Sequence, residues 1–203
     1  GDIGVFSFDH GKIITTGEGG MILTNKKKHD DYCRQYHDHG HENNKKLPRG
    51  RDTRKIFGFN YRMTEMQGAV GLAQIKKLKK ILRENKTRYD VLYKNLKDNY
   101  KIRTLFKGTT PSYDTMMFKV KNNNLRSKII SFLKKKKIGT KNVPDAIKWH
   151  FAHYWKHAIK REQIKSIQSS RKKIESYIAI PILIKQKVST YKEIGSYIKK
   201  LAD

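Results

Sequence analysis

Apolar positions near the start of the chain form two short runs on either side of a glycine-rich turn. Val5 to Phe8 and Met21 to Thr24 each have the length of a β-strand, and Gly17-Glu-Gly-Gly20 stands between them. From residue 26 to 58 the chain is polar and rich in His, Asn, Arg and Lys. We therefore predict two strands followed by a long irregular segment, a kind of loop that is often functional.

The next region carries the longest helical pattern. Thr64-Glu-Met-Gln67 has the sequence of a capping box, in which the two side chains at the ends satisfy each other's backbone N–H groups. Behind it, apolar residues recur at intervals of three and four as far as Leu96. We predict one long helix, or two helices broken near Asn85, over residues 64 to 98.

Beyond this helix, strand and helix patterns alternate. The predicted elements are a strand at 113–120, a helix at 125–136, a helical stretch at 160–176, a buried strand at 178–184 and a terminal helix at 191–201. Such alternation is typical of a small α/β domain. We therefore divide the chain into two parts, residues 1–98 and residues 99–203.

Composition adds a strong basic bias. Lys and Arg number 46 against 18 Asp and Glu, a formal net charge of +28, which suggests an anionic partner such as nucleic acid, a membrane surface or a phosphorylated substrate. However, the lysines are spread along the chain, and no basic and aromatic cluster resembles a surface for nucleic-acid strands. We favour compositional bias and expect no nucleic-acid partner. A basic nucleic-acid-binding protein remains the alternative from another functional class.

Cysteine content and hydropathy bear on location. Cys33 is the only cysteine, so an intrachain disulfide is impossible and a reducing compartment is expected. The longest apolar run, Ile178 to Ile184, is interrupted by proline and is too short to cross a bilayer. Without a signal-peptide pattern, we expect a cytoplasmic protein with no membrane partner. Because Gly1 leads directly into a strand pattern, we also expect the chain to be the later part of a longer protein.

The sharpest local signal for chemistry surrounds Lys12. In Ser7-Phe-Asp-His-Gly-Lys12-Ile-Ile-Thr-Thr-Gly-Glu-Gly-Gly20, a lysine follows a strand and stands beside a serine hydroxyl and glycines that expose backbone N–H groups. These are the parts needed by a lysine that binds a carbonyl group next to a phosphate. On these residues alone, a solvated surface lysine is the more common interpretation.

A family resemblance strengthens the chemical interpretation. The segment from Ser7 to Met21 resembles the active-site lysine motif of the DegT/DnrJ/EryC1/StrS sugar aminotransferases, and Gly58-Phe-Asn-Tyr-Arg-Met-Thr-Glu-Met-Gln67 resembles a later segment of the same family. These are pyridoxal-phosphate (PLP) enzymes of fold type I, the aspartate-aminotransferase-like α/β fold. The resemblance implies a fragment that lacks most of the N-terminal large domain. Residues 1–98 would then be the C-terminal part of the PLP-binding large domain, and 99–203 the small C-terminal domain.

The resemblance also implies roles for single residues. Lys12 would be catalytic and would hold PLP through its amine, while Ser7 would hydrogen-bond the cofactor phosphate. Asn60 and Arg62 would reach the phosphate of the neighbouring subunit's cofactor, since the family builds its sites across a homodimer interface. Outside the family, Asn60 is more commonly a turn residue and Arg62 a surface ion-pair partner. The groups that hold the PLP ring precede the lysine in this family, so the chain alone is expected to bind PLP poorly.

The implied reaction transfers an amino group from an amino acid, with glutamate expected, to a carbonyl of a sugar. The segments 7–9, 37–44, 47–54 and 149–151 are similar to a narrower branch, the 8-amino-3,8-dideoxy-manno-octulosonate (Kdo8N) transaminases. This similarity implies the C8 aldehyde of a Kdo-type octulosonate as substrate, in lipopolysaccharide sugar biosynthesis. The residues implied in substrate binding are His39, Arg49, Arg51, Arg54, Trp149 and His150. Arginines suit a carboxylate and a nucleotide diphosphate equally, so a nucleotide-linked keto-deoxyhexose stays open.

Two histidine clusters raise the question of a metal. They are His37, His39 and His41 in the polar segment and His150, His153 and His157 in the aromatic stretch. The first set alternates around Gly40 as in a loop, and nothing defines a tetrahedral site. The second set would share one helix face, but the aromatic residues around it favour packing or sugar contact. We therefore predict no metal. An inactive truncated dimer partner is a third possibility, against which the retained Lys12 and Ser7 argue.

Overall fold

The computed structural model describes residues 1–48 and 50–202. The chain forms two compact units, Gly1–Lys79 and Lys80–Asp203, which we call unit 1 and unit 2. The division lies inside one long helix, whereas the sequence pattern places the change of domain at residue 98. The assignment of 1–98 and 99–203 as domains stays a prediction.

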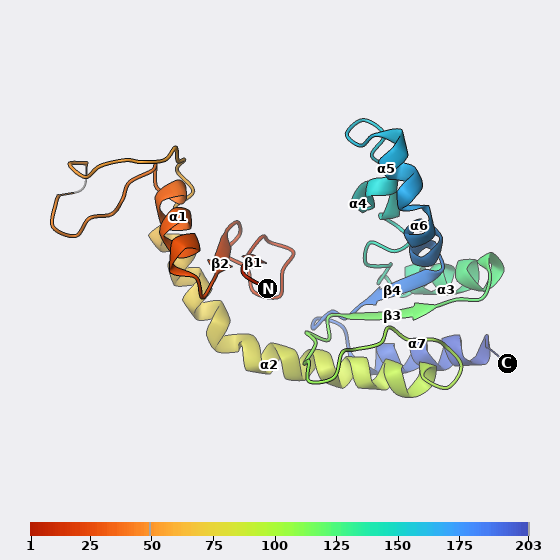
Figure 1. Ribbon diagram of the computed structural model, residues 1–203. Helices are drawn as coiled ribbons and strands as arrows, with labels where there is room; N and C mark the ends of the chain where they lie inside the picture. Colours follow the sequence, from red (N-terminus) through yellow and green to blue (C-terminus); the bar gives the residue numbers. More distant parts are fainter. Residues whose placement is uncertain (49, 203) are drawn as a thin grey trace. The chain divides into compact units, whose positions relative to one another are not determined.

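Unit 1 begins with a β-hairpin (Figure 1). Strand β1 (Gly4–Ser7) pairs antiparallel with β2 (Gly20–Leu23), so that Ser7 lies opposite Gly20. The two predicted strands are confirmed, each shifted by one residue. This pairing brings Ser7 and Gly20 together. The segment between them, which carries Lys12, therefore projects from one end of the hairpin.

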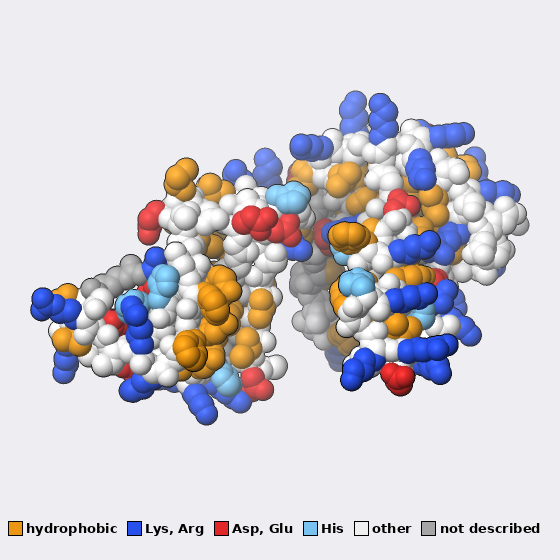
Figure 2. Space-filling model, turned by 90° about the horizontal axis from the view of Figure 1, so that it is seen from above, with side chains coloured by type: hydrophobic (Ala, Val, Ile, Leu, Met, Phe, Trp, Pro, Cys, Tyr) orange, Lys and Arg blue, Asp and Glu red, His pale blue; other side chains and the backbone are white. Residues whose placement is uncertain are grey.

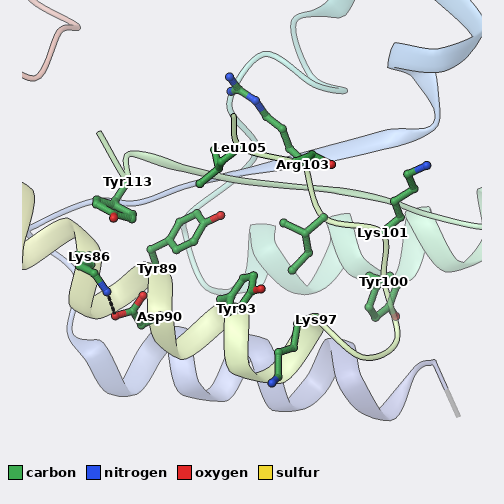
Figure 3. Close-up of a pocket in the computed structure, with 12 residues that line it drawn as sticks. Lys86, Tyr89, Asp90, Tyr93, Lys97, Tyr100, Lys101, Arg103, Leu105 and Tyr113 are labelled. Carbon is green, nitrogen blue, oxygen red and sulfur yellow. Dashed lines mark hydrogen bonds and ion pairs between the residues drawn. The ribbon is translucent and has the colours of Figure 1, made fainter. Parts of the chain in front are cut away.

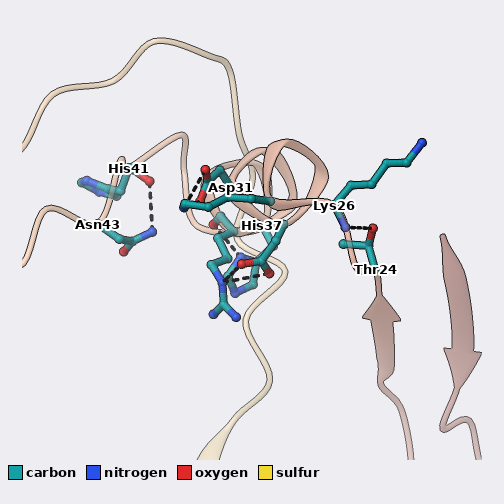
Figure 4. A network of polar contacts seen from close by, with 9 residues as sticks. Thr24, Lys26, Asp31, His37, His41 and Asn43 are labelled. Atoms are coloured by element: carbon teal, nitrogen blue, oxygen red, sulfur yellow. Dashed lines mark hydrogen bonds and ion pairs between the residues drawn. The ribbon is translucent and has the colours of Figure 1, made fainter. Parts of the chain in front are cut away.

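Helix α1 (Lys27–His37) lies in the segment predicted to be irregular, and there the prediction was wrong. Ion pairs one helical turn apart stabilise this helix: the Lys27 amine is 2.7 Å from the Asp31 carboxylate, and the Arg34 guanidinium is 2.9 Å from Asp30 (Figure 4). No residue of α1 is buried, which explains why an apolar period did not mark it.

Helix α2 (Glu65–Leu96) runs unbroken past Asn85 and links the two units. Its capping box is confirmed, because the Thr64 N–H donates to the Gln67 side chain at 2.9 Å and the Gln67 N–H donates to the Thr64 hydroxyl at 3.3 Å. Asn85 is buried, and its side chain donates to the Ser112 carbonyl at 3.2 Å. The Asn85 side-chain oxygen is buried without a hydrogen-bond partner among the described residues, yet the helix continues through this position.

Unit 1 has little apolar core. Every residue of β1 and β2 is exposed, and Val5 and Met66 are 74% and 81% exposed. Figure 2 shows hydrophobic side chains spread over the surface of this unit. Among its described residues no apolar side chain is buried. A two-stranded hairpin is marginal on its own, and exposed apolar faces of this kind are typical of surfaces that contact other protein.

Unit 2 contains the hydrophobic core. Strand β3 (Thr115–Lys119) pairs antiparallel with β4 (Tyr177–Pro181), and helices α3 (Asn123–Lys135) and α7 (Val188–Lys200) pack with the end of α2. The fully buried side chains are Leu92, Leu96, Met116, Phe118, Ile129, Leu133, Ile178, Ile180, Tyr191, Ile194 and Ile198. These elements confirm the predicted alternation of strands and helices.

The remaining elements of unit 2 are short helices: α4 (Ile147–His150), the 3₁₀ turn η1 (Ala152–Tyr154), α5 (Arg161–Ser166) and α6 (Gln168–Glu175). The helical stretch predicted at 160–176 is therefore broken. The expectation that His150, His153 and His157 share one helix face was wrong, since α4 ends at His150 and His153 lies in the separate turn η1. None of the helices in the described part of the chain has the length and apolar character needed to cross a membrane.

Candidate active site

Lys12 lies in the turn that follows β1. Asp9 organises this turn, because its carboxylate accepts a hydrogen bond from the Gly11 N–H at 2.6 Å and its carbonyl accepts one from the Lys12 N–H at 3.0 Å. The Lys12 amine is 3.3 Å from the Asp9 carboxylate, and half of the lysine side chain is exposed. The Gly11 amide lowers the pKa of Asp9, and the Lys12 amine adds to this effect against desolvation.

Ser7 stands at the end of β1, immediately before this turn. Its side chain is exposed, and its hydroxyl oxygen accepts a hydrogen bond from the Asp9 N–H at 3.4 Å. Asp9 therefore connects the serine hydroxyl to the lysine amine. The hairpin presents both groups from one short turn, as the sequence motif predicts.

The glycine-rich turn after Lys12 docks on the first turns of α2. Thr16 is buried, and its hydroxyl donates to the Glu18 carbonyl at 2.6 Å. The same carbonyl accepts a hydrogen bond from the Gln67 side-chain amide at 2.9 Å. At Gly71 a Cβ would lie 3.2 Å from the Thr16 methyl carbon, so a glycine there permits the close approach. The lysine motif and the 58–67 motif, distant in sequence, are thus in direct contact.

Asn60 and Arg62 lie on a segment that pairs with the end of α1. Asn60 forms an antiparallel bridge with Asp38 and has an exposed side chain. The Arg62 guanidinium donates to the Asp38 carboxylate at 2.6 Å, and the Asp38 side chain is only 10% exposed. Asp38 was not among the predicted site residues. The histidines beside Asp38 raised the question of a metal, whereas Arg62, with which it forms an ion pair, stands 24 residues further along the chain.

Two glycines permit this pairing. Gly40 has a φ of +80°, and a Cβ on Gly58 would lie 2.2 Å from the Gly40 nitrogen. No other residue fits such a backbone contact, so the path of the chain here depends on both glycines. His39, immediately before Gly40, is exposed and also has a positive φ of 54°.

A buried histidine organises the loop that carries the predicted substrate residues. An Arg54 N–H donates to His41 Nε2 at 3.1 Å, so the His41 proton must be on Nδ1, which lies 2.7 Å from the Asp52 carboxylate. Both His41 and Asp52 have side chains less than a tenth exposed. The His41 hydrogen bond lowers the pKa of Asp52, and the Asn43 N–H adds to this against desolvation. The Asn43 side chain also donates to the His41 carbonyl (Figure 4).

The other predicted substrate residues are less constrained. Arg51 is exposed in the same loop, and Arg49 lies outside the described residues. Trp149, 79% exposed, and His150 belong to α4 in unit 2, and their participation in the site stays a prediction. In the described part of the chain, no three His, Cys, Asp or Glu side chains gather as a metal site requires.

A separate cavity of about 580 Å³ lies in unit 2. Tyr89, Leu105 and Tyr113 turn toward one another in it, with Lys86 and Arg103 at its edge (Figure 3). The rings of Tyr89 and Tyr113 make an edge-on contact at 5.4 Å, and burial raises the pKa of Tyr89. None of the predicted site residues lines this cavity.

Comparison with known families decides how the lysine turn is interpreted. Residues 1–199 match the DegT/DnrJ/EryC1/StrS aminotransferase family, which is nearly the whole chain. This chain belongs to that family. The resemblance of the two motifs is thereby confirmed at the family level.

Individual relatives agree with this membership. The GDP-perosamine synthase of Escherichia coli O157:H7 is 30% identical over 143 residues, which cover 70% of this chain and 38% of that protein. The GDP-perosamine synthase of Caulobacter vibrioides is 46% identical over 78 residues, covering 38% of this chain and 20% of that protein. The chain therefore spans well under half the length of these relatives.

The fold is also confirmed. The crystal structure of the sugar aminotransferase CalS13 from Micromonospora echinospora superposes with a TM-score of 0.77 and 19% identity, and the match covers 98% of this chain and 52% of that one. The architecture is thus a fragment of fold type I.

PLP is the cofactor of this family's aminotransferases, and the hairpin carries side chains suited to two of its groups, the aldehyde and the phosphate. Lys12 offers a primary amine for an aldehyde, and the adjacent Ser7 offers a hydroxyl for a phosphate. The exposed Asn60 offers an amide donor on a segment whose backbone pairs with residues 37 to 39. In this geometry the Lys12 amine contacts Asp9, so binding a carbonyl group requires the amine to leave that carboxylate.

Proposed function

We propose that the natural protein, meaning the product of the gene that encodes these residues, is a PLP-dependent sugar aminotransferase. The observation that supports this most directly is the contact between the two family motifs, made by the Gln67 side chain on the Glu18 carbonyl. It fixes the turn behind Lys12 on the rigid helix α2. In a homodimer, Lys12 and Ser7 would bind one cofactor, while Asn60 would contact the phosphate of the neighbouring subunit's cofactor.

PLP, when bound, supplies an electron sink for amino-group transfer. The chain's own residues supply position and proton transfer. Once free of Asp9, the Lys12 amine would accept a proton from the amino donor, with glutamate expected, and return it at the next stage. The amino group would end on a carbonyl carbon of the sugar. We place this reaction in the cytoplasm.

For the sugar we propose a Kdo-type octulosonate with an aldehyde at C8, a precursor in lipopolysaccharide biosynthesis. Arg54 supports this choice, because His41 and Asp52 hold its guanidinium in place, and a guanidinium pairs well with a sugar carboxylate. Arg51 and the unit 2 residues Trp149 and His150 would complete the recognition. A nucleotide-linked keto-deoxyhexose is the second candidate, favoured by the name of the E. coli relative.

The cofactor assignment is tested by trapping. The natural protein is incubated with PLP, reduced with borohydride and digested, and we expect the added cofactor mass on the peptide that contains Lys12. Lys12→Ala should lose both the label and the transaminase rate. Lys26→Ala, an exposed lysine of the same unit, should keep both. Label on a different lysine, or a transaminase rate retained by Lys12→Ala, would contradict the proposal.

The substrate assignment needs a second assay. The natural protein is given glutamate and either the C8 aldehyde of a Kdo-type sugar or a GDP-linked keto-deoxyhexose, and 2-oxoglutarate is measured. We expect turnover of the octulosonate, with a higher KM in Arg54→Gln. Turnover of the nucleotide sugar alone would reject the octulosonate and leave the aminotransferase proposal intact.

A further inference from the structure

We infer that Asp52 acts on the sugar substrate through His41 and Arg54. By fixing the proton of His41 on Nδ1, Asp52 makes Nε2 the acceptor that holds the Arg54 guanidinium in the position that binds a substrate carboxylate. Asp52 and His41 are thus positioning residues, and neither contacts the sugar. The inference rests on the proposed function, in which Arg54 is the partner of the carboxylate. It adds two residues that were not among the predicted substrate residues.

The backbone brings these three side chains to one face of the loop. His41 and Arg54 form an antiparallel bridge, and beside it the Glu42 N–H donates to the Thr53 carbonyl at 3.2 Å. Residues opposite each other in such a pair carry their side chains on the same face. Asp52 precedes Arg54 by two residues, so its side chain stands on that face as well.

Burial makes Asp52 and His41 a rigid support. Their side chains are 4% and 8% exposed, and one carboxylate oxygen of Asp52 lies 2.7 Å from His41 Nδ1. The other oxygen accepts a hydrogen bond from the Asn43 N–H at 2.9 Å. A buried carboxylate with a bond on each oxygen has little freedom to turn. Arg54 itself is exposed, so the part of its guanidinium that His41 does not engage can contact a ligand.

The side chain at position 52 determines where the proton of His41 lies. A guanidinium only donates hydrogen bonds, so Arg54 needs a lone pair on His41 Nε2. A carboxylate only accepts, so it favours the neutral imidazole with its proton on Nδ1. Asparagine would reverse this choice. The Asn43 N–H would engage its single oxygen, its amide would donate to Nδ1, and the proton on Nε2 would then face the Arg54 donor and release it.

The test compares the C8 aldehyde of the Kdo-type sugar with its carboxamide, in which an amide replaces the carboxylate. With glutamate as donor, kcat/KM of the natural protein is measured for both, and the ratio of the two values isolates the carboxylate contribution. Arg54→Gln should lower this ratio by about tenfold, because a charge-assisted contact is lost. Asp52→Asn should lower it by about fivefold and leave kcat for the carboxamide unchanged. The double variant D52N/R54Q should stay within about twofold of Arg54→Gln, because Asp52 acts only through Arg54.

Nitrogen NMR of the natural protein with isotope-labelled histidine reads the tautomer directly, and a change of stability alone does not move this proton. We expect the His41 proton on Nδ1 in the wild type and on Nε2 in Asp52→Asn. The matched control is Asp31→Asn, the same change at an exposed carboxylate of α1. It should leave the His41 tautomer in place and change the ratio by less than about twofold.

The outcomes separate this inference from the proposed function. A ratio that Arg54→Gln lowers but Asp52→Asn does not, or an additive loss in D52N/R54Q, would overturn the inference and leave the proposed function intact. A wild-type His41 proton on Nε2 would do the same, even if Asp52→Asn does not fold. An unchanged ratio in Arg54→Gln, or no turnover of the octulosonate, would instead refute the proposed role of Arg54 and with it this inference.

Discussion

Replacing Arg88 with methionine should destabilise unit 2 strongly, because this buried guanidinium joins α2 to the segment between β4 and α7. Its side chain is 8% exposed. Nε donates to the Gln186 carbonyl at 2.9 Å and Nη2 donates to the Ile184 carbonyl at 3.0 Å. A third group, Nη1, donates to Glu84 one turn earlier in the helix.

The magnitude follows from the two bonds that cross between elements. A hydrogen bond from a charged donor contributes about 1.5–3 kcal/mol, and both carbonyls would lose their donor when methionine replaces arginine. Burial of the methionine side chain offsets part of this loss. We therefore expect Arg88→Met to lower the free energy of unfolding by about 3 kcal/mol.

Urea unfolding of the 203-residue chain, followed by tryptophan fluorescence, measures this change, since both tryptophans lie in unit 2. Lys86→Met is the matched control on the same helix. Its amine is 2.6 Å from the Asp90 carboxylate, but both side chains are about half exposed, so the midpoint should hardly move. A loss below about 1 kcal/mol for Arg88→Met, or an equal loss for Lys86→Met, would refute the reasoning.

Two further predictions concern pH and backbone contact. Burial acts to raise the pKa of Asp114, but hydrogen bonds from Lys141 and Ser112 outweigh it and lower the pKa, so the urea midpoint of unit 2 should fall as the pH drops below about 4. Asp114→Asn should flatten this dependence between pH 3 and pH 7, and an unchanged slope would count against it. Gly58→Ala should release its segment from α1, seen as faster tryptic cleavage of the natural protein, because the new Cβ meets a backbone nitrogen at 2.2 Å. Gly68→Ala, with no heavy atom within 4 Å, should digest like wild type, and equal digestion of both variants would reject this account.

Features with a local cause were predictable from the sequence. The capping box starts α2 because Thr64 and Gln67 need only each other, and the glycine-rich segment leads the chain directly from the first strand of the hairpin into the second. The lysine motif has the same local character. Family, fold and the position of Lys12 could therefore be inferred before any tertiary contact was known.

Helix α1 shows where local inference fails. Charged pairs four residues apart support it, and none of its residues is buried, so no buried apolar face marks it in the sequence. The polar composition that suggested a loop is compatible with a helix when opposite charges recur four residues apart. A search for hydrophobic periodicity alone cannot detect such an element.

The polar contacts of the site depended on the tertiary structure. Asp38 and Arg62 are 24 residues apart, and His41 and Asp52 are 11 apart, so no local pattern connects either pair. The backbone contact between residues 40 and 58, possible only for two glycines, brings the first pair together. The sequence by itself determined which chemical groups the chain carries and where its main elements begin. The tertiary structure decided which charges meet, because that depends on how distant segments approach one another.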